Sequence, residues 1–107
     1  MSKTIRFGIA IAAATLFTSS LAFAQSAGEA TYKAKCQSCH GAQGVPNAGI
    51  AKNMGVKPAN DPSVKAHTAA QMIAITTDGK GKMPAFKDKL TEPQIKDSVD
   101  YFRTFAK

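Results

Sequence analysis

The stretch KCQSCHG contains the residues of this chain that are best suited to chemistry. Cys36 and Cys39 are its only cysteines, and His40 directly follows the second one. Two thiols at this spacing can form a redox-active dithiol, supply two ligands of a zinc site, or attach a porphyrin covalently. The rest of the sequence has to distinguish these three kinds of site.

The surrounding sequence favours covalent attachment of a haem. A redox dithiol of this spacing accompanies strands in a βαβ unit, and the chain has no strand pattern. A zinc site usually takes four protein ligands, and beyond the motif the distant His67 would have to complete it. In haem attachment each thiol binds one vinyl group of the porphyrin, and the histidine after the second cysteine binds the iron. We therefore expect one haem c, attached through Cys36 and Cys39, with His40 as an iron ligand.

The second axial position of the iron decides between electron transfer and the binding of small molecules. Four side chains could occupy it: Met54, His67, Met72 and Met83. Met72 lies among helical apolar neighbours, Met54 in a long loop and His67 just before a helix, so other roles are expected for them. Met83 lies in GKGKMPAF, where glycines allow close approach of the backbone and the proline stiffens the following turn. We therefore predict Met83 as the second ligand, a soft thioether donor that raises the reduction potential.

The N-terminal segment has the features of a cleaved signal peptide. Two basic residues precede an apolar run over residues 7–17, and AFA at residues 22–24 has the small-x-small pattern of a cleavage site. The apolar run is shorter than the roughly 18 residues of a membrane-spanning helix. We predict residues 1–24 as the signal peptide and residues 25–107 as one periplasmic domain, with no stable membrane insertion after cleavage.

The charge of the predicted mature chain indicates a basic surface and no nucleic-acid arm. Without Lys3 and Arg6, 12 Lys and Arg stand against 7 Asp and Glu, a formal charge of +5. The charges are dispersed, without a block of five or six of one sign, so nucleic-acid binding is not expected. Five lysines flank the segments that carry the predicted ligands: Lys35, Lys80, Lys82, Lys87 and Lys89. We expect this monomeric chain to use them in docking on acidic patches of redox partner proteins.

Capping signals predict three main helices and no strands. Ser26 and Glu29 form a capping-box pattern that starts a helix from about Ala27 to Cys36. Thr68 and Gln71 start a second helix that ends at Gly79. A third helix follows Thr91 and runs to about Ala106, and a single extra turn is expected at Asp61-Pro62-Ser63. The fold class is therefore all-α.

The space between these helices calls for a large apolar group that is not protein. Residues 41–62 are rich in Gly, Pro and Asn and are expected to form a long loop, which leaves little protein core. A haem would fill that centre, enclosed by five predominantly apolar side chains: Tyr32, Met72, Ile73, Phe86 and Phe102.

Taken together, the chain resembles the class I cytochromes c, the small bacterial monohaem type. The resemblance covers the predicted mature chain in order, through Gly28 and Tyr32 ahead of CQSCHG, the glycine-rich loop, MPAF and the last helix with SVDYFRTF. It implies that Cys36 and Cys39 attach the haem and that His40 and Met83 are its axial ligands. It also implies that the first and last helices cross at Gly28, against Tyr101 or Phe102. The family's hydrogen bond from the ligand histidine to a proline carbonyl could here involve Pro46 or Pro58.

These features predict an electron-transfer protein and not an enzyme. We expect a periplasmic one-electron carrier between a reductase or dehydrogenase and an oxidase or other acceptor. Two alternatives stay open: a haem protein that binds or senses small ligands because its sixth ligand is labile, and a cytochrome subunit of a periplasmic dehydrogenase complex. A dihaem peroxidase would need two attachment motifs, and this sequence has one.

Overall fold

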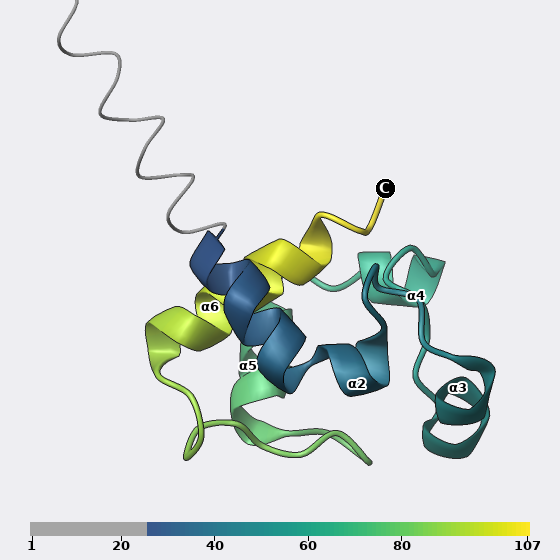
Figure 1. Cartoon of the computed structure of the whole chain (residues 1–107), viewed down its shortest axis with the longest axis horizontal. Coiled ribbons are helices and arrows are strands. Elements are labelled where there is room, and N and C mark those ends of the chain that lie inside the picture. The colour runs from purple at the N-terminus through teal and green to yellow at the C-terminus, as the bar shows by residue number, and fades with distance from the viewer. Residues whose placement is uncertain (1–25) are drawn as a thin grey trace, which may run out of the picture.

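The computed structural model describes residues 26–107, and over this range the protein is built from helices and loops (Figure 1). The one β feature in these residues is an isolated antiparallel bridge between Lys80 and Met83. The predicted all-α class is therefore confirmed. The predicted signal peptide, residues 1–24, lies outside the described residues.

The N-terminal and C-terminal helices cross and form the best-packed part of the protein. The first described helix covers residues 26–35, and α6 spans Glu92–Arg103. Figure 1 shows the N-terminal helix, in dark blue, passing across α6. The capping box predicted at Thr91 and Gln94 is present. The helix ends three residues before the predicted Ala106, because the chain continues into short turns after Arg103.

Gly28 permits this crossing. A Cβ atom at this position would lie 2.8 Å from the carbonyl carbon of Asp97 and 3.3 Å from Cβ of Tyr101. One turn further along, Tyr32 is 1% exposed, with its ring centroid 5.3 Å from that of Tyr101 and 5.9 Å from that of Phe105. The predicted crossing is confirmed, with Tyr101 as the aromatic partner of the glycine. The lost helix propensity of Gly28 is thus offset by tight aromatic packing.

Helix α5, Ala69–Asp78, lies behind this pair and packs against α6. Its predicted capping box at Thr68 and Gln71 is formed in both directions, and Gly79 ends it with φ 79°. The extra turn predicted after Asp61 is α4, Pro62–Lys65, where the Asp61 carboxylate accepts a hydrogen bond from Ser63 N–H at 2.9 Å. Both predictions are confirmed.

Two further short helices were not predicted, one just before the predicted long loop of residues 41–62 and one within it. Helix α2 spans Gln37–His40, and α3 spans Ala48–Met54. Asn47 caps α3 by accepting a hydrogen bond from Ile50 N–H at 2.8 Å, and Gly55 ends it in the left-handed conformation with φ 68°. Helix α3 contains no buried residue. Its glycines and missing apolar stripe resemble a loop in the sequence, and the prediction of an unbroken loop was wrong here.

Candidate cofactor site

A large cavity gathers the residues that the sequence analysis selected. Its volume is about 850 Å³, within the range of about 300–1,000 Å³ typical of ligand sites. Cys36 lines it from the junction between the N-terminal helix and α2, Cys39 and His40 line it from α2, and Met83 lines it from the α5–α6 connection. The fold therefore brings together side chains that are more than 40 positions apart in the sequence.

A short, tightly hydrogen-bonded turn presents the two thiols and the imidazole to this cavity. The amide of Cys36 still bonds to Tyr32 O at 2.8 Å, and the amide of His40 bonds back to Cys36 O at 2.9 Å. Gly41, with φ 83°, then turns the chain away from α2. The hydroxyl of the buried Tyr32 donates a hydrogen bond to the carbonyl of Gly41 and so ties this turn to the first helix.

The two cysteines are free thiols and are half-buried. Burial and, to a smaller extent, the neighbouring Cys39 raise the pKa of the Cys36 thiol to about 11. No disulfide joins the pair. Within residues 26–107 no three His, Cys, Asp or Glu side chains come together as metal ligands, so the zinc site with His67 is not formed. The contribution of the cysteines is therefore two adjacent thiols at the wall of a cavity.

His40 is held as a neutral imidazole in an apolar surrounding. Burial lowers its pKa below the ordinary value, and the edge of its ring meets Phe102 at a centroid distance of 5.2 Å. Its Nδ1 atom is buried without a hydrogen-bond partner. The carbonyl of Pro58, one of the two acceptors considered for His40, instead accepts a hydrogen bond from the amide of Asp61. A buried ring nitrogen without a partner is uncommon in proteins. Neutral imidazole is also the form that binds metals.

Met83 lies in a hairpin with unusual backbone geometry. Its N–H and C=O each bond to Lys80 at 3.0 Å, and Gly81 between them has φ 58°. Because no non-glycine residue here has positive φ, the turn follows the type II′ pattern. A Cβ at Gly79 would meet the carbonyl oxygen of Met83 at 2.9 Å. The two glycines that the sequence analysis singled out therefore allow the backbone to fold back and place Met83.

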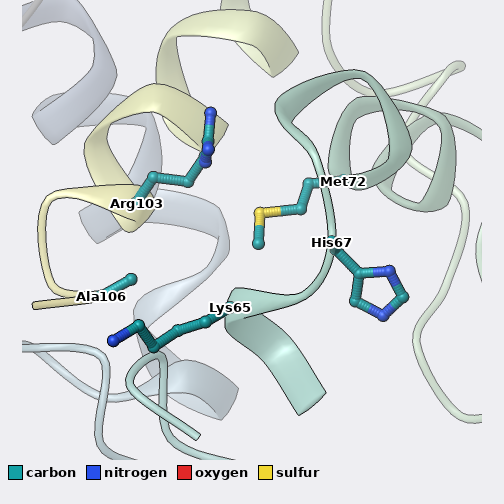
Figure 2. A pocket seen from close by; sticks show the side chains of 5 residues that line it. All are labelled: Lys65, His67, Met72, Arg103 and Ala106. Atoms are coloured by element: carbon teal, nitrogen blue, oxygen red, sulfur yellow. The ribbon is translucent and has the colours of Figure 1, made fainter. Parts of the chain in front are cut away.

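The other three ligand candidates also line the cavity, so lining alone does not distinguish them. Met72 and His67 additionally border a smaller cavity of about 190 Å³, shown in Figure 2. There the Met72 thioether points into the smaller space, and the His67 ring points away from it. Met72 is 8% exposed in the middle of α5, as a core residue would be. Met54 is the last residue of α3.

The walls of the large cavity are mainly apolar. Four of the five predicted side chains line it, namely Tyr32, Met72, Phe86 and Phe102. Ile73 does not, because on α5 the residues that share a face with Met72 are Ile75 and Thr76. These two residues and Val99 were not among the predicted wall residues, although the i, i+3, i+4 spacing on α5 could have indicated the pair.

Five exposed lysines border the cavity where it reaches the surface, and no Asp or Glu lines it. We call them the mouth lysines: Lys35, Lys57, Lys80, Lys82 and Lys89. Lys57 was not predicted, and the loop after α3 brings it to the cavity. Lys87, the fifth lysine predicted to take part in docking, does not line the cavity.

These observations fit a covalently attached haem. The cavity has the size of a cofactor site and apolar walls, with two thiols adjacent to a half-buried neutral imidazole whose buried Nδ1 atom has no partner. A thioether from the Met83 hairpin completes a set of soft and borderline donors suited to haem iron.

Comparisons with known proteins agree with this fit. The family described as cytochrome C oxidase, cbb3-type, subunit III matches residues 23–102. Cytochrome c6 of Nostoc sp. (strain PCC 7120 / SAG 25.82 / UTEX 2576) is 33% identical over 97 residues, which cover 91% of this chain and 85% of that protein. Cytochrome c-555 of Chlorobaculum thiosulfatiphilum is 38% identical over 88 residues, covering 71% and 90%. Among solved structures, the KustC0563 c-type cytochrome superimposes with a TM-score of 0.67 at 29% identity, covering 75% of this chain and 98% of that one.

Proposed function

The chain belongs to the c-type cytochromes, which carry covalently bound haem c and transfer electrons, and from this premise we propose a one-electron carrier with His40 and Met83 as its axial ligands. The observation that carries the proposal is the single cavity lined by both thiols, the imidazole and the Met83 hairpin. When bound, the haem supplies an iron that cycles between Fe(II) and Fe(III).

The protein residues contribute attachment, ligation and exclusion of water. Cys36 and Cys39 provide the thiols for two thioether bonds, and the low pKa of His40 keeps its imidazole available as a ligand. Tyr32, Phe86 and Val99 are buried walls that keep water away from the site. Because these groups are held in place by packing, little of the surrounding structure has to change between the two oxidation states.

The central test is Met83→Ala. Loss of the thioether should lower the reduction potential and allow rapid binding of carbon monoxide to the reduced protein. The weak long-wavelength absorption band of a sulfur–iron(III) bond should disappear at the same time. Met54→Ala is the matched control, since it removes the same atoms from another methionine that lines the cavity, and it should keep the band. An unchanged potential in Met83→Ala would move the ligand role to Met54 or His67.

The proposed location and boundaries follow from the N-terminal segment. We assign residues 1–24 to a cleaved signal peptide and residues 25–107 to one exported, monomeric domain in the periplasm. No helix among the described residues is long and apolar enough to cross a membrane. The mass of the purified protein tests the boundary: a chain that begins at Gln25 supports cleavage, and an intact Met1 contradicts it.

The mouth lysines support docking on acidic redox partners. Five cationic groups border the cavity, and no carboxylate is among the residues that line it, so an excess of positive charge surrounds the mouth. Hexacyanoferrate(III), an anionic oxidant, can stand in for such a partner. Raising the salt should slow oxidation by this anion at least several-fold, because salt screens the attraction.

Two variants with the same loss of charge sharpen that measurement. Lys80→Gln removes a mouth lysine, and Lys87→Gln removes a lysine on the same connection whose side chain does not line the cavity. We expect the first to weaken the salt dependence more than the second. Equal effects, or a rate that does not depend on salt, would reject a localised docking surface.

The family description favours one alternative, in which the chain is the haem subunit of a larger complex. The two forms share the chemistry of the site and differ in having a permanent partner. The size of the native protein in a periplasmic extract separates them. Elution near the mass of the single chain supports the free carrier, whereas elution as part of a larger assembly that contains other subunits supports the alternative.

A further inference from the structure

Among the mouth lysines, Lys82 stands out because its ammonium group bonds to a backbone carbonyl far away in the sequence. Its Nζ atom donates a hydrogen bond to the backbone carbonyl of Asn53 at 2.5 Å, although the two residues are 29 positions apart. Lys57, in contrast, reaches Ser63 at 3.4 Å, and Lys89 lies 5.5 Å above the ring of its close neighbour Phe86. Figure 1 shows the tip of the α5–α6 connection extending towards α3, which ends next to Asn53.

The acceptor of this bond is well suited to a cation. The last carbonyls of a helix have no partner within the helix, and the C-terminal end carries partial negative charge. In α3 the amide of Gly55 bonds to the carbonyl of Ala51, and the left-handed Gly55 then leads the chain away. The carbonyl of Asn53 is thus left facing outwards, and the charged Lys82 satisfies it with a charge-assisted hydrogen bond.

The bond between Lys82 and Asn53 holds the tip of the Met83 hairpin, which the other hydrogen bonds of this segment do not attach to the rest of the protein. The two hydrogen bonds between Lys80 and Met83 are internal to the hairpin. On the returning side, Phe86 N–H bonds to Thr76 O at 3.0 Å and so attaches the connection to α5. At the tip, Lys82, the residue immediately before Met83, attaches it to α3.

We infer that Lys82 is a positioning residue whose bond to the Asn53 carbonyl holds Met83 towards the cavity. The inference rests on the proposed ligation by Met83 and assigns to Lys82 a role other than docking. Without this bond, the hairpin spends more time turned away from the cavity, and a competing ligand gains access more readily. The apparent affinity of such a ligand increases with the fraction of molecules in which the site is open.

Three variants of the haem-loaded, oxidised protein test this role by titration with imidazole. Lys82→Met removes the donor but keeps the length of the side chain, Lys82→Arg restores a donor, and Lys87→Met removes an equal charge outside the cavity. We expect Lys82→Met to bind imidazole about three- to tenfold more tightly than wild type, the effect of losing one exposed charge-assisted hydrogen bond. Lys82→Arg and Lys87→Met should remain within about twofold of wild type. Equal affinities for Lys82→Met and Lys87→Met overturn the inference.

A second readout separates this inference from the ligation on which it rests. If wild-type protein lacks the sulfur–iron(III) band, the assignment of Met83 as a ligand fails. Hydrogen exchange at the Phe86 amide, whose bond to Thr76 O attaches the connection to α5, then still reports how firmly the hairpin is held. Lys82→Met should accelerate that exchange about three- to tenfold, and Lys87→Met should not. Exchange at wild-type rates in Lys82→Met would overturn the positioning role, whatever the ligand proves to be.

Discussion

The crossing of the terminal helices and the α3 side of the cavity are stabilised in different ways. At the crossing, Tyr32 and Ile95 are each 1% exposed, and aromatic rings pack around the backbone of Gly28. On the other side, α3 has no buried residue and is joined to the Met83 hairpin through the Lys82 hydrogen bond. The crossing thus contains its own core, whereas the α3 side encloses a cavity that a cofactor has to fill.

The comparison indicates that the cofactor stabilises the α3 side of the cavity in addition to supplying the chemistry. A chain of this size buries a small core, so a covalently held group that fills the centre adds a large share of the contacts. The segments that contact that group should depend on it most. The terminal crossing should depend on it least.

Removal of the attachment thiols should therefore have the largest effect. In the double variant Cys36→Ala with Cys39→Ala, we expect amide exchange over residues 41–61 and 80–90 to increase by about tenfold or more, because the walls of the cavity lose their partner atoms. Amides in α6 next to Ile95 should change less. Hydrogen exchange of the variant and of the haem-loaded wild type measures this contrast, and equal loss of protection in both regions would show that the chain has one indivisible core.

Two glycine substitutions should affect the two regions in opposite directions. Gly28→Ala would place Cβ against the carbonyl group of Asp97, and we expect the free energy of unfolding to fall by about 2 kcal/mol despite the better helix propensity. Gly49→Ala, in α3, meets only Asn47 Oδ1 at 3.5 Å and should raise it by about 0.5–1 kcal/mol. Chemical denaturation measures both, and stabilisation by Gly28→Ala would contradict the close crossing.

The hydroxyl of Tyr32 should contribute a smaller amount, since it joins the crossing to the turn that carries the thiols. Tyr32→Phe leaves the carbonyl of Gly41 without this donor, and we expect a loss of about 1 kcal/mol. Tyr101→Phe is the matched control on the neighbouring ring, with an expected change within about 0.5 kcal/mol. Equal values for the two variants would show that ring packing alone, and not the hydrogen bond, matters at Tyr32.

The same hydroxyl predicts a dependence of stability on alkaline pH. Burial raises the pKa of Tyr32 from the ordinary 10.0 to about 12 in the folded protein. Because the folded pKa lies above the unfolded one, the stabilising contribution is complete below pH 10 and is lost as the pH rises from about 10 to 12. The difference in unfolding free energy between wild type and Tyr32→Phe should shrink over this window. A constant difference would contradict ionisation of this side chain.

Much of the helical structure could be predicted from local sequence signals, and the exceptions have physical reasons. The capping residues Thr68 and Thr91 started α5 and α6 as expected, because a cap depends on residues within one turn. Helix α3 was missed because a short exposed helix without an apolar stripe resembles a loop. We could not predict that Lys57 lines the cavity mouth and that Lys87 does not, because the path of the intervening chain decides which side chains reach the cavity.

The amino-acid sequence specifies the reactive groups of this protein: a pair of thiols followed by an imidazole, a methionine that follows a glycine-containing turn and precedes a proline, and helices with strong start signals. Each of these depends on residue types and on spacings of a few positions. The tertiary structure alone decided which distant groups meet. It placed Gly28 against Asp97, enclosed His40 in apolar walls with Nδ1 lacking a partner, and joined Lys82 to the end of α3. Such contacts result from the packing of whole elements against one another, which no local pattern encodes.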